Sequence, residues 1–210
     1  MSWREFHSCP MAPQALRAAL LLTFTLAAPL AAAQTSTPAR APVLTEQPVD
    51  GSAIRRVQAE TVIVAPYAAV VARVLDYEHY PEFMQRFRTA RVVRRNRGAT
   101  DVYFQLELPR AMGIVWFLHR MTVVSRTSDR IEIAGVAQSG NVGSVESRVI
   151  VERIPGAHES ARLTFALYGS PVVPALPDTV NDTLRHAVRW ASVLLQGNVE
   201  RTANAARPRR

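Results

Sequence analysis

The sequence predicts an α+β fold in which an antiparallel sheet of about seven strands precedes one long C-terminal helix. First, a β-branched run ends at Ala65 and gives way to a helical apolar pattern after Pro66. Second, apolar and polar residues alternate in several later segments, which short turns rich in Gly, Asn, Asp, Pro and Ser connect. Third, the segment after residue 178 carries apolar side chains at the spacing of an amphipathic helix.

Residues 56–84 are expected to form a strand at 56–64 followed by two short helices. Pro66 stands where the first helix would begin, a position that proline favours. Asp76 then breaks the apolar pattern. Pro81 can begin the second helix, because the first turn of a helix does not use the N–H group that proline lacks.

The remaining strands are expected at 85–97, 102–108, 114–125, 131–136, 145–154 and 162–168. Consecutive strands on such short connections form an antiparallel meander. Segment 85–97 carries six arginines and no acidic residue, a pattern that could also bind nucleic acid. We interpret it as a strand whose outer face is solvated by arginine, and expect no nucleic-acid partner.

The final helix can be capped by Asp178 or Thr179 and is expected to end or fray at Gly197-Asn198. Its apolar side should face the sheet and its polar side should face solvent. The apolar stripe consists of Val180, Leu184, Ala187, Val188, Ala191, Leu194 and Leu195, and the outer side carries Arg185, Arg189, Ser192 and Gln196. Residues 205–210 are expected to be a disordered basic tail.

Residues 1–33 have the pattern of a signal peptide. Arg17 precedes an apolar run at 18–30, and three alanines at 31–33 offer a cleavage site before Gln34. The run is too short to cross a hydrocarbon core as a helix, which needs about 20 residues, although an uncleaved anchor is an alternative. The start codon could be Met1 or Met11. We expect an exported protein, periplasmic or secreted, with a flexible linker at 34–53 and one domain at 54–204.

Residues 65–84 resemble a known family. The step Ala-Pro-x-x-x-Val, followed by Val-Leu-Asp-Tyr-Glu-His-Tyr-Pro-Glu-Phe-Met, is similar to the opening of START-like helix-grip domains (the SRPBCC superfamily). The similarity is closest to the polyketide cyclase/dehydrase and coenzyme-Q-binding group and extends loosely over 56–196. It implies a curved antiparallel sheet that grips the C-terminal helix, with an apolar cavity between them. The family includes carriers, cyclases and chaperone regulators, so the fold alone does not determine the activity.

The resemblance and the strand alternation suggest which residues line this cavity. The candidates are Phe83, Phe104, Leu106, Phe117, His119, Met121, Phe165, Leu184 and Val188. The aromatic residues, Trp190 of the final helix among them, are expected to belong first of all to the core. No catalytic motif, phosphate-binding loop or metal-ligand spacing occurs, and the only cysteine, Cys9, precedes the apolar run. We therefore expect no catalytic residue, metal or cofactor.

His119 alternates with Phe117 and Met121, so a neutral imidazole there could bond a ligand carbonyl or act as a base. The alternative is a structural histidine, satisfied by neighbouring backbone or placed at the sheet margin. His186 lies one turn from Asp182 and is interpreted as half of a pair on the helix surface. Asp76 is interpreted as a helix-end hydrogen-bonding residue rather than a catalytic acid.

Two functions fit these observations. The first is a non-enzymatic protein that binds or carries a hydrophobic small molecule such as a lipid or an isoprenoid quinone. The second is a cyclase- or dehydratase-type enzyme acting on a polyketone-like substrate, in which His119 would work with a cavity acid or tyrosine. A protein-interaction module is a third possibility. The sequence does not identify the ligand or the oligomeric state.

Residues 112–118 are apolar at nearly every position, unlike a strand with one wet face. If Val115 and Phe117 point inward, the other apolar side chains point outward. These candidates for membrane contact are Met112, Ile114, Trp116 and Leu118. The C-terminal segment or another subunit could cover the same patch instead.

Overall fold

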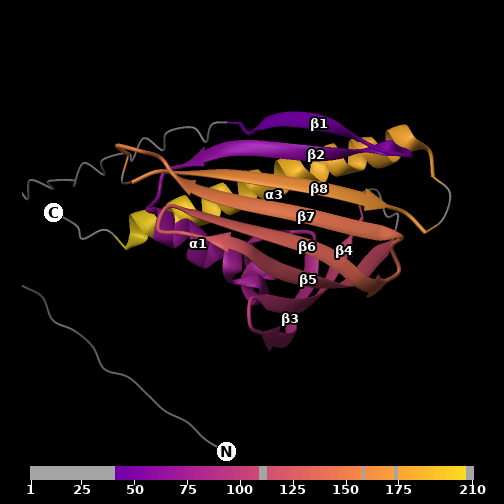
Figure 1. Ribbon diagram of the computed structural model, residues 1–210, viewed down its shortest axis with the longest axis horizontal. Coiled ribbons are helices and arrows are strands. Elements are labelled where there is room, and N and C mark those ends of the chain that lie inside the picture. The colour runs from indigo at the N-terminus through magenta and orange to yellow at the C-terminus, as the bar shows by residue number, and fades with distance from the viewer. Residues whose placement is uncertain (1–40, 109–112, 158, 173–174, 207–210) are drawn as a thin grey trace, which may run out of the picture. The chain divides into compact units, whose positions relative to one another are not determined.

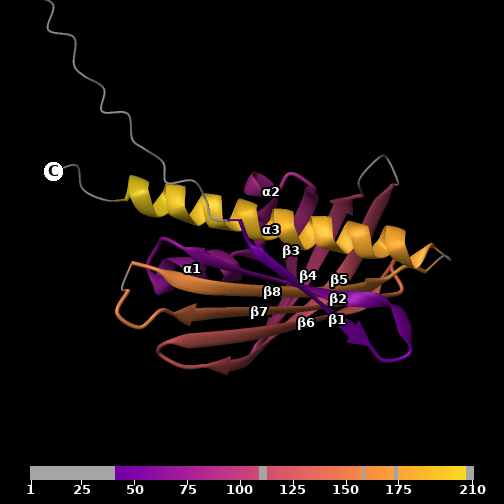
Figure 2. The ribbon, with the colours of Figure 1, turned by 90° about the horizontal axis from the view of Figure 1, so that it is seen from above.

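The computed structural model describes residues 41–108, 113–157, 159–172 and 175–206, which form one antiparallel sheet of eight strands with a long helix along one face (Figures 1 and 2). The predicted α+β fold is confirmed. The strands are β1 (Val43–Val49), β2 (Ser52–Ile63), β3 (Phe87–Asn96), β4 (Ala99–Glu107), β5 (Ile114–Arg126), β6 (Arg130–Gly140), β7 (Ser144–Arg153) and β8 (Ala161–Ser170). The helices are α1 (Tyr67–Leu75), the 3₁₀ helix η1 (Tyr77–His79), α2 (Tyr80–Phe83) and α3 (Pro177–Ala205).

The strand order is β1-β2-β8-β7-β6-β5-β4-β3, and every neighbouring pair is antiparallel. Strands β3 to β8 form a meander, as predicted. The last strand then returns to pair with β2, where Phe165 lies opposite Ala59. Helices α1, η1 and α2 therefore carry the chain from β2 to β3 at the far edge of the sheet.

The two short helices predicted after β2 are present, with η1 between them. Tyr67, Val70 and Val74 of α1 are buried against the sheet. The helix ends at Asp76, whose carboxylate accepts a hydrogen bond from Arg73 at 3.0 Å and lies 2.5 Å from Nδ1 of His79. Asp76 thus acts as a helix-end hydrogen-bonding residue.

The expected linker at 34–53 is wrong from residue 43 onward, because β1 and the start of β2 occupy this region as a hairpin. Pro48 and the polar residues of the segment obscured the strand in the sequence. The structure accommodates Pro48 because β1 is an edge strand and its register shifts between Gln47 and Val49. Gly51 in the turn adopts a φ of 72°, which glycine tolerates. The predicted signal peptide and residues 34–40 lie outside the described residues.

The predicted end of the final helix at Gly197-Asn198 is also wrong, since α3 continues to Ala205. Val199 is buried in the same core cluster as α1, and Ala203 packs against that cluster. Tertiary packing therefore outweighs the low helix propensity of Gly197 and Asn198. Of the expected disordered tail at 205–210, residues 207–210 lie outside the described part of the chain.

The predicted outer side of α3 needs a second correction, because Ser192 and Gln196 are buried. The Gln196 side chain joins α3 to β2: its Oε1 accepts a hydrogen bond from Thr61 at 3.2 Å, and its Nε2 donates to the Val62 carbonyl at 3.2 Å. The Ser192 hydroxyl donates to the Val188 carbonyl at 2.9 Å. Both polar side chains have hydrogen-bond partners inside the core, so their polarity alone did not indicate that they face solvent.

The core lies between the inner face of the sheet and the helices. Helix α3 packs mainly against β2 and β8 and also contacts α1. Its N-terminal part is fixed to β2 by Asn181, whose Oδ1 accepts a hydrogen bond from the Arg55 backbone N–H at 2.8 Å. Among the described helices, none is long and apolar enough to cross a membrane.

Candidate functional site

A cavity of about 520 Å³ lies between the inner face of the sheet and α3. Strand β4 contributes Phe104 and Leu106 to its wall, and β5 contributes its inward-facing residues, which alternate along the strand. Strands β7 and β8 and the cavity-facing side of α3 complete the wall. Most of the lining side chains are apolar, so the cavity provides a non-polar environment for a bound molecule.

The cavity has a rim that carries two charged side chains and a closed end formed by buried apolar residues. The charged side chains among its described lining residues are Arg86 and Glu107, which lie beside the β4–β5 connection. The other end is formed by buried residues, including Val74, Met121 and Leu163. Because Val115 lines the cavity near the rim and Met121 near the closed end, β5 runs along the length of the cavity.

His119 is the buried polar group of the β5 wall, with only 2% of its surface exposed. Its Nε2 atom lies 2.9 Å from the Ser147 hydroxyl on β7 and forms a hydrogen bond with it. Burial lowers the pKa of His119 to about 4, because the apolar surroundings disfavour the charged ring. The imidazole is therefore neutral at neutral pH.

Gly135 on β6, the strand between β5 and β7, makes the contact between His119 and Ser147 possible. A Cβ atom at Gly135 would lie 2.3 Å from Nε2 of His119 and 2.4 Å from the Ser147 hydroxyl. Any side chain at position 135 would thus displace one of these groups. The sequence left two alternatives for His119, a cavity-facing ring and a structural histidine bonded to neighbouring backbone. The ring does line the cavity, but it also has a structural partner, which is a serine side chain and not the backbone.

Seven of the nine predicted cavity residues line the wall: Phe104, Leu106, Phe117, His119, Met121, Phe165 and Leu184. Phe83 and Val188 do not. Phe83 is buried in the core beside Tyr80, and Val188 packs with Val57 and Ala59 of β2. The side of α3 that faces the cavity carries Leu184, Ala187 and Ala191, whereas Val188 faces β2. That any of these residues contacts a ligand stays a prediction.

Part of the cavity wall consists of residues that were not predicted from the sequence. Val145, Ser147 and Val149 on β7 and Leu163 and Leu167 on β8 line the cavity. Their spacing of two along predicted strands could have identified them, once the inward face of each strand was known.

Two predictions on α3, the surface pair of His186 and Asp182 and the core position of Trp190, differ from the structure. The Asp182 carboxylate pairs with Arg185, not with His186. The His186 ring instead lies 5.8 Å from the Trp190 ring, measured between centroids. Trp190 is 46% exposed and is not a core residue. The expected surface pair of His186 and Asp182 is therefore wrong.

The strand β5 presents apolar side chains on both faces, as predicted. Val115 and Phe117 line the cavity, while Ile114 and Trp116 are more than a third exposed on the outer face. Trp116 stacks on Tyr103 of β4 with ring centroids 6.2 Å apart. Leu118 is half-buried on the same outer face, and Met112 lies outside the described residues.

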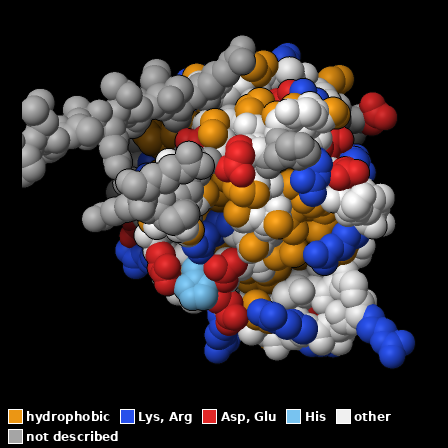
Figure 3. Space-filling view, turned by 90° about the vertical axis from the view of Figure 1, so that its left-hand side faces the viewer, with side chains coloured by type: hydrophobic (Ala, Val, Ile, Leu, Met, Phe, Trp, Pro, Cys, Tyr) orange, Lys and Arg blue, Asp and Glu red, His pale blue; other side chains and the backbone are white. Residues whose placement is uncertain are grey.

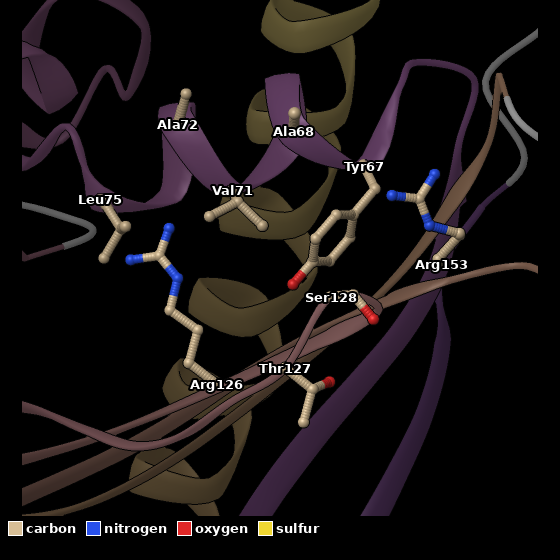
Figure 4. Close-up of a pocket in the computed structure, with 9 residues that line it drawn as sticks. All are labelled: Tyr67, Ala68, Val71, Ala72, Leu75, Arg126, Thr127, Ser128 and Arg153. Carbon is tan, nitrogen blue, oxygen red and sulfur yellow. The ribbon is translucent and has the colours of Figure 1, made fainter.

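A second pocket, of about 390 Å³, lies between α1 and the turn that joins β5 to β6 (Figure 4). Tyr67 stands between Arg126 and Arg153 in this pocket. Arg153 is already engaged, because it lies 5.3 Å from the centre of the Tyr67 ring and donates a hydrogen bond to Asp129 at 2.8 Å. Figure 3 shows this end of the molecule, where basic side chains lie beside hydrophobic ones. The larger apolar cavity is the better candidate site.

The described residues contain no cluster of three or more His, Cys, Asp or Glu side chains that could hold a metal ion.

Comparison with solved structures identifies similar folds. A STAR-related lipid transfer protein from Xanthomonas axonopodis is 13% identical and superposes with a TM-score of 0.67, covering 77% of this chain and 94% of its own. A START superfamily protein from Mycobacterium smegmatis is 18% identical with a TM-score of 0.61, covering 70% of this chain and 98% of its own. The Zhui aromatase/cyclase from Streptomyces sp. R1128 is 16% identical with a TM-score of 0.56, covering 72% of this chain and 97% of its own. No family model and no curated protein matches the sequence. The chain thus has the START-like helix-grip fold that its opening residues suggested.

Proposed function

We propose that this protein binds and carries a hydrophobic small molecule in the cavity between the sheet and α3, without chemical conversion. The observation that carries the proposal is the cavity itself, whose volume of about 520 Å³ lies within the range of small-molecule sites and whose wall is mainly apolar. The likeness to lipid transfer proteins supports the same function. A lipid or an isoprenoid quinone has suitable chemistry.

The proposed setting is the cell envelope. The signal-peptide pattern at 1–33 supports export to the periplasm or the medium. An apolar ligand is poorly soluble in water, so a carrier would be needed between membranes or between a membrane and an enzyme. N-terminal sequencing of the protein from its native host tests export, and an intact residue 11–30 segment on the mature protein would contradict it.

The carrier function can be tested by filling the cavity. Ala187 lines the cavity on α3, whereas the neighbouring Arg189 is exposed. Native mass spectrometry of gently purified protein, followed by organic extraction, should detect an apolar ligand on the wild type and on Arg189→Trp. Ala187→Trp should lose the ligand while retaining its circular dichroism spectrum. An unchanged ligand load in folded Ala187→Trp would refute binding in this cavity.

The alternative is a cyclase- or dehydratase-type enzyme, favoured by the likeness to an aromatase/cyclase and by His119 in the cavity wall. Such chemistry needs a second proton-transfer group near the histidine. The two tyrosines of the wall are engaged elsewhere: Tyr80 donates a hydrogen bond to the Val74 carbonyl, and Tyr168 donates to Ser52. The acid among the described lining residues, Glu107, is paired with Arg88. The geometry therefore supports the carrier better.

We also propose that the outer face of β5 contacts a lipid surface. Trp116 and Ile114 are exposed on the strand that also carries Arg120, and tryptophan favours the boundary between headgroups and acyl chains. Trp116→Ala should weaken co-sedimentation with anionic vesicles. Val43→Ala, which changes an exposed apolar residue on the edge strand β1, should not. Equal binding by both variants would favour a patch covered by protein.

A further inference from the structure

The cavity wall contains a polar atom whose hydrogen-bonding capacity is unused. Nδ1 of His119 is buried and has no hydrogen-bond partner among the described residues. Buried polar atoms are nearly always paired, because an unpaired one loses its hydration without compensation. The side chain that carries this atom lines the cavity, so a bound molecule could supply the missing partner.

The His119 ring is held in one place by three neighbouring strands. The Ser147 hydroxyl fixes Nε2 from β7 at 2.9 Å, and the bare backbone of Gly135 on β6 leaves room for this contact. The rings of Phe117 and Phe104 flank the imidazole, with centroids 5.4 Å and 6.3 Å away. Because Ser147 occupies Nε2, a ligand would hydrogen-bond to Nδ1.

This polar group lies well inside the cavity. Val115 stands near the rim, and His119 follows four residues later on β5, which places it about 13 Å further along the strand at the usual rise per residue. Only Met121 lies deeper among the cavity-lining residues of β5. A ligand that reaches His119 would therefore enter with its polar end first.

The surroundings of His119 exclude a charged ligand group. The ring is neutral at neutral pH, because burial lowers its pKa to about 4, and it cannot balance a carboxylate. The charged side chains of the described cavity lining, Arg86 and Glu107, are at the rim. A neutral hydroxyl or carbonyl oxygen is the group that the imidazole can bind without burying a charge.

Resting on the proposed carrier function, we infer that His119 and Ser147 form a polar anchor that hydrogen-bonds one neutral oxygen group at the innermost end of an otherwise apolar ligand. Nδ1 of His119 can donate or accept this hydrogen bond, depending on the tautomer of the ring. If Ser147 donates to Nε2, then Nδ1 carries the proton and donates to a carbonyl or hydroxyl oxygen. If Nε2 donates to Ser147, then Nδ1 accepts a hydrogen bond from a hydroxyl group.

Displacement of the neutral fluorescent probe N-phenyl-1-naphthylamine by four molecules of equal chain length tests the anchor. These are dodecan-1-ol, dodecan-2-one, dodecane and dodecanoate. The variant His119→Phe keeps the cavity filled but removes both nitrogens. We compare the ratio of alcohol or ketone affinity to dodecane affinity in wild type and variant, since this cancels differences in solubility.

The wild-type ratio for the alcohol or the ketone should exceed the His119→Phe ratio roughly tenfold, the effect of one hydrogen bond to a group otherwise left unpaired. A His119-dependent gain for the ketone identifies the tautomer with the proton on Nδ1, because a ketone only accepts a hydrogen bond; a gain for the alcohol alone identifies the tautomer in which Nδ1 accepts. Dodecanoate should gain nothing from His119. Gly135→Ala should act like His119→Phe, because the new Cβ displaces the anchor. Thr202→Ala should leave the ratio unchanged, since this exposed α3 hydroxyl lies outside the cavity and is bonded to the Asn198 carbonyl.

A spectroscopic measurement on the wild type covers the case in which a variant does not fold. With ¹⁵N-labelled histidine, dodecan-1-ol or dodecan-2-one should shift the Nδ1 resonance of His119, and dodecane should not. Equal ratios in wild type and His119→Phe, or an Nδ1 resonance that no polar probe shifts, would overturn the anchor while leaving the carrier function intact. Failure of the naphthylamine and of all four molecules to bind the wild type would instead overturn the carrier function.

Discussion

The buried His119 should make the stability of the protein fall as the pH is lowered. Its pKa is about 4 in the folded chain, against 6.5 for an ordinary histidine. Between these values the unfolded chain binds a proton that the folded chain does not, so acid favours unfolding. Each pH unit of this difference is worth about 1.4 kcal/mol, so His119 should cost about 3 kcal/mol of stability between pH 7 and pH 4.

The perturbation that isolates this effect is His119→Gln, which removes the titrating ring and retains an amide that can reach Ser147. Urea denaturation of wild type and variant at half-unit steps from pH 7 to pH 4 measures the free energy of unfolding of each. The wild type should lose about 3 kcal/mol more than the variant over this range. A difference between the two proteins that stays constant with pH would refute a histidine buried in its neutral form.

His79 provides a control of opposite sign. Its pKa is raised, first by the hydrogen bond to the Asp76 carboxylate and then by the charge of that group. The stability that it contributes is present below the unfolded pKa and is lost as the pH rises through the folded pKa. At low pH, His79→Gln should therefore lower the free energy of unfolding relative to the wild type, whereas His119→Gln should reduce the loss of stability that acid causes.

Three further predictions concern stability. Leu184→Ala should destabilise the fold by about 2–5 kcal/mol in urea denaturation, because Leu184 is buried on the side of α3 that faces the sheet. Arg189→Ala on the exposed side should change stability by less than about 0.5 kcal/mol, and equal losses would show that the buried side of α3 is misplaced. Gln196→Ala should cost about 1–3 kcal/mol, since it leaves a hydroxyl and a carbonyl of β2 without their partner, and a neutral effect would contradict this link. The hydrogen bond from Arg120 lowers the pKa of Asp101, so its stabilisation is present above the unfolded pKa and lost as the pH falls through the folded one; Asp101→Asn should show a weaker loss of stability in acid than the wild type.

The strands could be predicted because apolar and polar residues alternate along them, and this alternation indicates which face of each strand is buried. The alternation placed Phe104 and Leu106 on one face of β4, and both line the cavity. It also placed Val115 and Phe117 of β5 inward, leaving Trp116 outside. The opening strand and short helices were equally clear, since Pro66 and Asp76 mark where α1 begins and ends.

The errors arose where contacts distant in sequence decide the local structure. Strand β1 has a weak pattern, and its ion pairs reach other elements: Glu46 bonds to Arg55 on β2 and to Arg185 on α3. The burial of Gln196 depends on acceptor and donor groups of β2 that lie far away in the sequence. No local propensity contains this information.

The cavity was expected only from the family resemblance, and its polar anchor could not be predicted at all. Ser147 and His119 lie on strands separated by β6, and they meet because Gly135 between them has no side chain. Three separate sequence positions are therefore needed for one contact. A serine and a glycine at these positions carry no signal by themselves.

The pKa of His119 also bears on the choice between a carrier and an enzyme. A general base works best with a pKa near the operating pH, and a pKa of about 4 places this imidazole roughly 4 kcal/mol below that optimum as a proton acceptor at pH 7. The same low pKa suits hydrogen bonding, because it keeps one nitrogen as a donor and the other as an acceptor at all physiological pH values. An NMR titration of His119 in the ligand-free protein should therefore give a pKa below 5. A value near 7 would remove this objection to base catalysis and favour the cyclase-type alternative.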